Sequence, residues 1–367
     1  MKEPEKINFI DALRGYAVLA VVLVHSLNGD RDIVFHNVIL LGAKGVQLFY
    51  TLSAFTLFLS FNVRRETDYA TQNFFIRRFF RIAPMFYLAI VYYLIQDINV
   101  SYSDNDFRRI TSWSVVSHFF LLHSLSPYWE NSVVPGGWSV GVEVIFYMIC
   151  PLLFALIKNL RAAITVYFIT LIMGQAIYLY LLNNPLIEFT ETWKLYLYTF
   201  FPTQLPVFML GIVGYYIVKS ERYVAIMALI GLYVCGAAFL ILQYISNKYM
   251  NTEFELLNNM VFGTLFITLI FGLSIRSIPI ISNKPVQFIG KISYSMYLTH
   301  FAVVHLIDVL GLNYLFLNVT MSFLVRFLLI LSGTVIVSYF FYKTIELPFI
   351  KIGKNFTRTK EKVSLIG

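Results

Sequence analysis

The chain has 367 residues, of which 58% are hydrophobic and only 13% are charged, and its formal net charge is +8. A typical soluble domain carries about 25% charged residues, so this chain has too few polar groups to cover a water-exposed surface. The composition excludes a soluble enzyme and a disordered protein, and it predicts an all-α, polytopic membrane protein. The two cysteines, Cys150 and Cys235, lie in apolar runs and offer neither a disulfide framework nor a metal-binding spacing.

Ten segments are long and apolar enough to form a helix that crosses the bilayer core, which takes about 20 residues. In chain order, these predicted spans cover residues 9–28, 39–61, 79–98, 137–157, 162–182, 195–218, 223–245, 257–275, 292–310 and 315–341. Another apolar stretch, residues 113–127, is only about 15 residues long and contains His118 and His123, so we expect it to be re-entrant or interfacial. No cleavable signal peptide is expected, because Arg14 interrupts the first apolar run.

The distribution of basic residues orients these spans. If the N-terminus lies inside, twenty of the 28 Lys and Arg residues fall in inner segments, five in outer segments and three within spans. Cytoplasmic loops are enriched in Lys and Arg, and treating residues 113–127 as a full span would remove the asymmetry. We therefore predict that both termini are cytoplasmic, with an integral membrane domain over residues 1–350 and a basic cytoplasmic tail over 351–367.

The first predicted span carries ionisable residues, which are costly inside a bilayer and therefore indicate function. Arg14 and His25 are eleven residues apart, so a helix places them on one face, about 16 Å apart along its axis. Asp11 lies one turn before Arg14 and can pair with it. The alternative is structural: Asp11 and Arg14 form an interfacial ion pair, and His25 caps the outer end of the helix.

The fourth predicted span places a glutamate near the bilayer midplane. Ser139, Glu143 and Tyr147 follow one another at intervals of four residues and share one helix face. Because Glu143 lies at about the depth of His25, the two can act as a base and the carboxylate that orients it. Alternatively, Glu143 is a structural hydrogen-bonding residue, or it pairs with Lys44 of the second span.

Three arginines, Arg77, Arg78 and Arg81, stand at the inner end of the third predicted span. Guanidinium groups at a cytoplasmic interface suit phosphate oxygens, which they bind through paired hydrogen bonds. A basic cluster at this depth can instead serve topology or bind anionic lipids.

The ninth predicted span opens with a polar stripe of Ser293, Tyr297 and His300, spaced i, i+4, i+7. Such a stripe often only holds membrane helices together. The chain contains no Walker A, GxGxxG, HExxH or CxxC motif, so the sequence gives no support to nucleotide hydrolysis, dinucleotide redox chemistry or a classical zinc site.

Five of these segments, in this order, resemble the motifs of the acyltransferase-3 family of integral membrane acyltransferases. The matching motifs are FIDALRG (9–15) with His25, GVQLFYTLSAF (45–55), RRFFRIAP (77–84), WSVGVEVIFY (138–147) and SYSMYLTH (293–300). The ending around residues 346–348 also fits, so the resemblance extends over nearly the whole chain. The family usually has glycine at the position of Ala54 and a second acidic residue at the position of Val144.

The resemblance implies an O-acyltransferase that moves an acyl group, most often acetyl, from cytoplasmic acyl-CoA to a hydroxyl of an envelope or extracellular glycan. It implies catalytic roles for His25, Glu143 and Arg14, with His25 as general base or as nucleophile. The CoA phosphates are expected to bind the arginine cluster, Arg77, Arg78 and Arg81. Supporting roles are expected for Asp11, Lys44, Trp138, Ser139, Tyr147, Ser293, Tyr297 and His300.

The resemblance also implies a multi-pass protein of the bacterial cytoplasmic (inner) membrane. Its expected partners are membrane lipids, the acyl-CoA donor, a free or lipid-linked glycan acceptor and polysaccharide-assembly proteins, but no nucleic acid. Acetyl-CoA or another acyl-CoA is the expected donor substrate, with no permanently bound cofactor and no metal. Two other functions remain open: a carrier or flippase for a lipid-linked glycan or small anion, and a scaffold subunit of an envelope-polysaccharide assembly.

Overall fold

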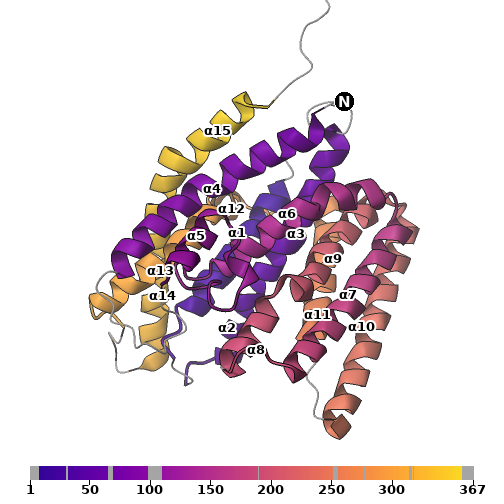
Figure 1. Cartoon of the computed structure of the whole chain (residues 1–367), viewed down its shortest axis with the longest axis horizontal. Coiled ribbons are helices and arrows are strands. Elements are labelled where there is room, and N and C mark those ends of the chain that lie inside the picture. The colour runs from indigo at the N-terminus through magenta and orange to yellow at the C-terminus, as the bar shows by residue number, and fades with distance from the viewer. Residues whose placement is uncertain are drawn as a thin grey trace, which may run out of the picture.

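The structure is a computed structural model that describes residues 8–29, 32–64, 69–97, 110–188, 190–250, 255–276, 278–313, 316 and 318–357. These residues form helices joined by turns (Figure 1). The elements are α1 (Asn8–His25), α2 (His36–Leu40), η1 (Leu41–Lys44), α3 (Gly45–Arg64), α4 (Ala70–Asp97), α5 (Ser112–Phe119), η2 (His123–Leu125), α6 (Trp138–Leu156), α7 (Leu160–Asn183), α8 (Thr190–Thr199), α9 (Phe201–Lys219), α10 (Arg222–Met250), α11 (Glu255–Ile275), α12 (Lys284–Lys291), α13 (Ser293–Val309), α14 (Val319–Phe341), η3 (Tyr342–Glu346) and α15 (Leu347–Asn355).

Among the described residues, seven helical segments have the length and hydropathy of membrane spans, and this confirms a polytopic helical membrane protein. They are Asn8–His25, His36–Asn62, Ala70–Asp97, Trp138–Leu156, Leu160–Asn183, Glu191–Lys219 and Val319–Asn355. Two shorter apolar helical segments, Arg222–Ala238 and Asn259–Ile275, coincide with further predicted spans, and α13 coincides with the ninth. The count of ten spans and their orientation stay predictions.

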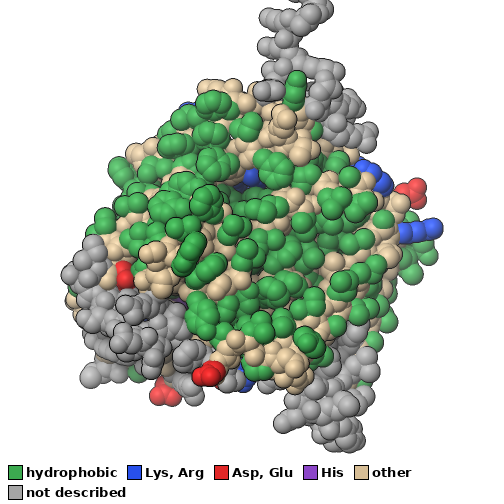
Figure 2. Space-filling view, in the orientation of Figure 1, with side chains coloured by type: hydrophobic (Ala, Val, Ile, Leu, Met, Phe, Trp, Pro, Cys, Tyr) green, Lys and Arg blue, Asp and Glu red, His purple; other side chains and the backbone are tan. Residues whose placement is uncertain are grey.

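The distribution of side chains is that of a protein solvated by lipid. Hydrophobic side chains cover most of the face seen in Figure 2, and charged ones lie mainly toward its edges. Large apolar residues such as Ile336 and Phe340 are exposed, whereas Gln47, Gln204 and His300 are fully buried. In water this arrangement would be unfavourable, but in a bilayer the polar groups satisfy one another inside the bundle while apolar groups contact lipid.

Helix α1 lies at the centre of the packing that forms the site, in contact with α3, α12 and α13. Its approach to α12 is close enough to require glycine. A Cβ atom added to Gly290 would lie 1.6 Å from the backbone oxygen of Asp11, and one added to Gly15 would lie 2.3 Å from the oxygen of Val286. The absence of a Cβ at Gly15 and Gly290 therefore allows this close contact, which sets the position of α1, and with it that of Arg14, against α12.

The segment predicted to be re-entrant or interfacial folds into α5, a turn and the short helix η2. At eight and three residues, neither helix is long enough to cross a bilayer. The stacked rings of His118 and His123 lie 4.1 Å apart, and the Nε2–H of His123 donates to the backbone oxygen of Gly137 at 2.8 Å. This bond ties the segment to the residue that precedes α6, the helix carrying Glu143.

The C-terminal end of the described chain packs on the bundle. A π-helical turn, η3, joins α14 to α15, which runs alongside α4 in Figure 1. The ring of Phe356 stacks on Phe80 of α4 with centroids 5.6 Å apart. The predicted boundary between residues 350 and 351 thus falls inside a continuous helix, and residues 358–367 of the predicted tail lie outside the described residues.

The orientation of the spans can be tested at the two ends of α7, where Lys158 and Asn184 are both exposed. In a chain whose two cysteines are replaced by alanine, we expect a membrane-impermeant maleimide to label Asn184→Cys in intact cells. Lys158→Cys should react only after permeabilisation, because the basic residues place this end inside. Labelling of Lys158→Cys in intact cells would contradict the predicted topology.

A second test concerns Glu130, which is buried in the loop before α6 and accepts a hydrogen bond from Thr199 at 2.6 Å. Burial raises the pKa of Glu130 from 4.5 to about 7, against the opposite effect of that hydrogen bond. Between these values the folded state binds more protons than the unfolded state, so the free energy of unfolding falls as pH rises.

We therefore expect the apparent melting temperature in detergent to fall between about pH 5 and pH 8, with a shallower fall in Glu130→Gln. Fluorescence-detected thermal unfolding of the two proteins at matched pH values provides the measurement. Identical slopes for wild type and variant would show that the carboxyl of Glu130 contributes nothing to this dependence.

Candidate active site

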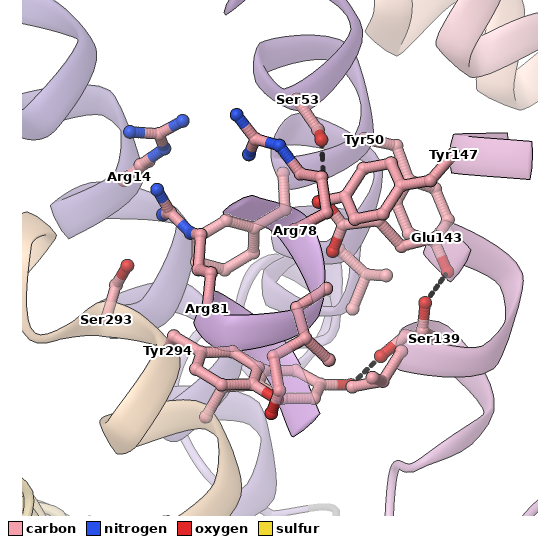
Figure 3. Close-up of a pocket in the computed structure, with 15 residues that line it drawn as sticks. Arg14, Tyr50, Ser53, Arg78, Arg81, Ser139, Glu143, Tyr147, Ser293 and Tyr294 are labelled. Carbon is pink, nitrogen blue, oxygen red and sulfur yellow. Dashed lines mark hydrogen bonds between the residues drawn. The ribbon is translucent and has the colours of Figure 1, made fainter. Parts of the chain in front are cut away.

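A pocket opens among α1, α3, α4, α6 and α13 (Figure 3). Charged and hydroxyl side chains make up much of its lining, which is unusual for the interior of a membrane protein. The lining residues are Arg14, Val46, Phe49, Tyr50, Ser53, Arg78, Arg81, Ile82, Ser139, Val140, Glu143, Tyr147, Ser293, Tyr294 and Tyr297.

Three guanidinium groups share this pocket. Arg14 comes from α1, and Arg78 and Arg81 come from α4; in Figure 3 their heads gather on one side of the space. The Nη1 atom of Arg14 lies 3.9 Å from Asp11, and its Nη2 atom donates to Thr56 Oγ1 at 3.3 Å. Asp11 is thus the predicted partner of Arg14, at the long end of ion-pair distances.

The guanidinium of Arg78 rests on aromatic rings. It lies 5.6 Å from the ring centroid of Tyr147 and 5.8 Å from that of Phe74, within cation–π range. Its Nε atom is buried and makes no hydrogen bond among the described residues. A buried donor of this kind costs free energy unless a ligand or water satisfies it, so the pocket is suited to an acceptor-rich anion.

The structure divides the arginine cluster. Arg78 and Arg81 line the pocket, whereas Arg77 is half-buried and is not among the lining residues. The sequence pattern placed all three at one interface. Arg77 lies 100° around the helix from Arg78 and one turn, about 6 Å, before Arg81, which leaves it at the margin of the face that lines the pocket.

Glu143 is the carboxylate of the pocket. Its Oε1 atom accepts hydrogen bonds from Ser53 Oγ at 2.5 Å and from Tyr147 Oη at 2.6 Å. Tyr147 therefore contacts Glu143 with its hydroxyl and Arg78 with its ring. One aromatic side chain thus contacts both the carboxylate and a guanidinium of the pocket.

A second group of hydroxyls lies beside α6, at its N-terminal end. Ser139 Oγ donates to Tyr297 Oη at 2.7 Å, and Tyr297 Oη donates to the backbone oxygen of Gly136 at 2.9 Å. Tyr50 donates to the backbone oxygen of Ser139 at 3.1 Å and packs edge-on against Trp138. Ser293 also lines the pocket, so four of the eight predicted supporting residues lie there: Ser139, Tyr147, Ser293 and Tyr297.

His25 lies outside this pocket, at the opposite end of α1 from Arg14. Its Nδ1 atom is 3.3 Å from Nε2 of His300, and its ring centroid is 4.5 Å from that of Phe301. Among the described residues, no hydrogen bond joins His25 to Glu143. The matched depth of these two residues along the membrane normal therefore does not produce the contact that the sequence suggested.

Lys44 also lies away from the pocket. It ends η1, and its Nζ atom donates to Asn259 Oδ1 at 3.0 Å and to Tyr198 Oη at 3.4 Å. The ammonium further lies over the rings of Tyr198 and Phe262. The alternative that Lys44 pairs with Glu143 is therefore not what the structure shows.

Several pocket residues carried no role in the sequence analysis. Ser53, the residue bonded to Glu143, lies in the motif of residues 45–55, but the sequence pattern predicts no role for its hydroxyl. Tyr50 and Tyr294 also line the pocket, and Tyr294 donates to the backbone oxygen of Ile82 at 2.8 Å. A polar residue in an otherwise apolar span was the available signal for Ser53.

Half-buried arginines and a hydroxyl-bonded carboxylate line a pocket in a bundle whose long apolar helices are those of a membrane protein. A family model described as "Acyltransferase domain" matches residues 7–343, which is nearly the whole chain. The chain therefore belongs to the acyltransferase-3 family.

Two relatives are similar along most of this chain. One, ORF330 of Acidianus two-tailed virus, is provisionally named an acetyltransferase; it is 27% identical over 323 residues, covering 87% of this chain and 88% of its own length. The other, the peptidoglycan O-acetyltransferase OatA of Listeria monocytogenes, is 24% identical over 371 residues, covering 94% of this chain. This chain spans 56% of the length of that protein. No solved structure matches the chain.

Proposed function

We propose that the protein is an acyl-CoA-dependent O-acyltransferase that moves an acyl group, most often acetyl, to a hydroxyl of an envelope or extracellular glycan. The observation that carries this proposal is the convergence of Arg14, Arg78 and Arg81 in one pocket. Acyl-CoA is an acyl donor with a diphosphate and a further phosphate, so it matches a guanidinium-lined site in both charge and chemistry.

The donor enters from the cytoplasmic side in this proposal. Arg78 and Arg81 belong to the end of α4 that the basic residues place inside, where they bind phosphate oxygens. Arg77 does not line the pocket and serves topology or lipid contact instead. Arg14 binds a further phosphate, because it lies about 16 Å along α1 from His25 and cannot reach a thioester group that reacts there.

The acyl transfer itself is assigned to His25. As general base, His25 takes the proton of the acceptor hydroxyl while the hydroxyl oxygen attacks the thioester carbon; the carbon–sulfur bond breaks, and the CoA thiolate takes that proton as it leaves. As nucleophile, the ring nitrogen displaces CoA and carries the acyl group until the hydroxyl oxygen displaces it. Because Arg14 and His25 lie about 16 Å apart along α1, the extended arm of the donor must run along this helix.

The acceptor class rests on the relative named as a peptidoglycan O-acetyltransferase, and on the predicted outer position of His25. A glycan hydroxyl presented from outside, free or lipid-linked, can reach that residue without crossing the membrane. We place the reaction in the cytoplasmic membrane of a bacterium, with lipids and polysaccharide-assembly proteins as further partners. The reaction as written consumes acyl-CoA and needs no permanently bound cofactor.

Donor binding can be tested with three matched arginine variants of the purified protein. We expect Arg78→Ala and Arg81→Ala each to weaken CoA binding by about tenfold or more, because each removes a charge-assisted contact worth roughly 1.5–3 kcal/mol. Arg77→Ala should bind CoA like wild type. Isothermal titration in detergent provides the measurement, with size-exclusion profiles as the control for folding.

A lysine at position 78 or 81 should still bind CoA more weakly than wild type, since an ammonium keeps the charge but loses the two-pronged contact. Equal loss for all three alanine variants would point to a general electrostatic effect rather than to the pocket. Unchanged binding in the Arg78→Ala, Arg81→Ala double variant would refute the donor site.

The reaction can be tested with acetyl-CoA and a panel of envelope glycans that includes soluble peptidoglycan fragments. We expect release of free CoA thiol together with O-acetylated glycan, and His25→Ala should reduce the rate by about 10²–10⁴ or more while retaining CoA binding. Glu143→Gln should lose less than His25→Ala, since Glu143 lies in the pocket and not beside His25. Full activity in His25→Ala would refute the assignment, and glycan translocation without thiol release would identify a carrier.

A further inference from the structure

The ring of His25 is held by a second histidine. His25 is half-buried at the end of α1, and His300 of α13 is fully buried behind it. Nδ1 of His25 and Nε2 of His300 are 3.3 Å apart, and the ring of Phe301 packs against both imidazoles, with centroid distances of 4.5 and 4.2 Å. The family resemblance implies a catalytic role for His25 and only an unspecified supporting role for His300, and it says nothing of a contact between them.

The hydrogen bonds determine which nitrogen of each ring carries a proton. Nδ1 of His300 lies 2.7 Å from the backbone oxygen of Tyr297. A carbonyl oxygen only accepts, so Nδ1 of His300 is the protonated nitrogen. His300 is fully buried and takes part in none of the ion pairs of the described residues, so it is neutral, and its Nε2 carries a lone pair.

The tautomer of His25 follows from that of His300. A lone pair on Nε2 of His300 requires a donor, and the nitrogen facing it is Nδ1 of His25. The proton of neutral His25 therefore sits on Nδ1, which leaves Nε2 of His25 with a free lone pair on the other side of the ring. That nitrogen is the one able to take a proton or to attack a carbonyl carbon.

The backbone that carries His25 is fixed separately. Arg326 of α14 is buried; its Nη1 donates to the backbone oxygen of Ser26, its Nη2 to Asp308 Oδ1 at 2.7 Å, and its Nε to Asn313 Oδ1 at 3.0 Å. This guanidinium ties the end of α1 to the outer ends of α13 and α14. Arg326 thus holds the backbone beside His25, while His300 contacts the imidazole ring.

We propose that His300 is a positioning residue for acyl transfer: it accepts a hydrogen bond from Nδ1 of His25, and so keeps Nε2 of His25 unprotonated and directed at the reacting groups. The chain of hydrogen bonds runs from the backbone of Tyr297 through His300 to His25. In this respect His300 does for His25 what an orienting carboxylate does for a catalytic histidine, without placing a charge in the bilayer. The inference rests on the proposed function, because His25 is the transferring residue there.

The first arm of the test observes the tautomer directly. Ring-nitrogen NMR spectra of the full chain in detergent, labelled with ¹⁵N-histidine and assigned with His25→Gln, report which nitrogen carries the proton. We expect His25 of the wild type to be protonated at Nδ1. Protonation at Nε2 overturns the proposal, whatever the variants do and whether or not a glycan acceptor is found.

The second arm uses two replacements at the same position. The side-chain oxygen of His300→Gln can still accept from Nδ1 of His25, whereas His300→Phe fills the space without an acceptor. We expect His300→Phe to redistribute the His25 proton between the two nitrogens and to lower kcat by about 10–100-fold, with an unchanged KM for acetyl-CoA. His300→Gln should stay within a few-fold of wild type, and so should the control His305→Phe, at an exposed position of the same helix.

The outcomes separate the two proposals. Equal losses in His300→Gln and His300→Phe, or a wild-type His25 tautomer in His300→Phe, would show that His300 only packs the helices and would overturn the positioning role. If the wild type releases no thiol with any glycan of the panel, the proposed function fails, while the tautomer measurement still decides whether His300 orients His25.

Discussion

Three positively charged guanidinium groups share one small space inside a bundle whose exterior is apolar, and the arrangement of the site follows from the cost of keeping them there. Unit charges 4 Å apart at an effective dielectric constant of about 20 repel one another by about 4 kcal/mol. The structure offsets part of that cost. Asp11 lies near Arg14, aromatic rings lie under Arg78, and Glu143 adds a negative charge to the lining.

These groups leave the site incompletely neutralised. Three cations face one carboxylate on the pocket wall, and a buried nitrogen of Arg78 has no partner among the described residues. A ligand with several negative oxygens would satisfy both deficits at once, whereas a neutral ligand would satisfy neither. The same imbalance argues against a purely structural role, since a pocket built only for stability would be expected to pair its charges.

The tight contact of α1 with α12 sets the positions of two functional residues, Arg14 in the pocket and His25 outside it. Gly15 and Gly290 hold α1 at a fixed height, so Arg14 sits in the pocket while His25 emerges eleven residues later at the other end of the helix. Because both residues belong to one rigid helix, their separation along the axis cannot change by side-chain motion alone. In the proposed reaction, the donor phosphates and the reacting acyl group are thereby held at different depths.

The sequence predicted the parts of the fold that depend on local composition. Apolar runs set the positions of the long helices, and the shortness of residues 113–127 anticipated α5 and η2, because length and hydropathy need no knowledge of neighbours. The sequence did not predict which helices pack side by side. Spacing along α1 and α6 gives the depth of His25 and Glu143, but the packing of α13 against α1 decides that His25 contacts His300.

The motif of residues 293–300 shows how one helix joins the two ends of the site. Ser293 and Tyr297 line the pocket. His300 follows Tyr297 by about one helical turn and contacts His25 outside the pocket. Tyr297 belongs to both groups: its hydroxyl bonds to Ser139 and Gly136 beside the pocket, and its backbone oxygen accepts a hydrogen bond from Nδ1 of His300. A spacing of i, i+4, i+7 is what a single helix needs to line a cavity with two residues and to present a third, on the same face, at a greater depth. The motif that first indicated only a polar helix stripe thus connects the arginine-lined pocket with the histidine of the proposed reaction.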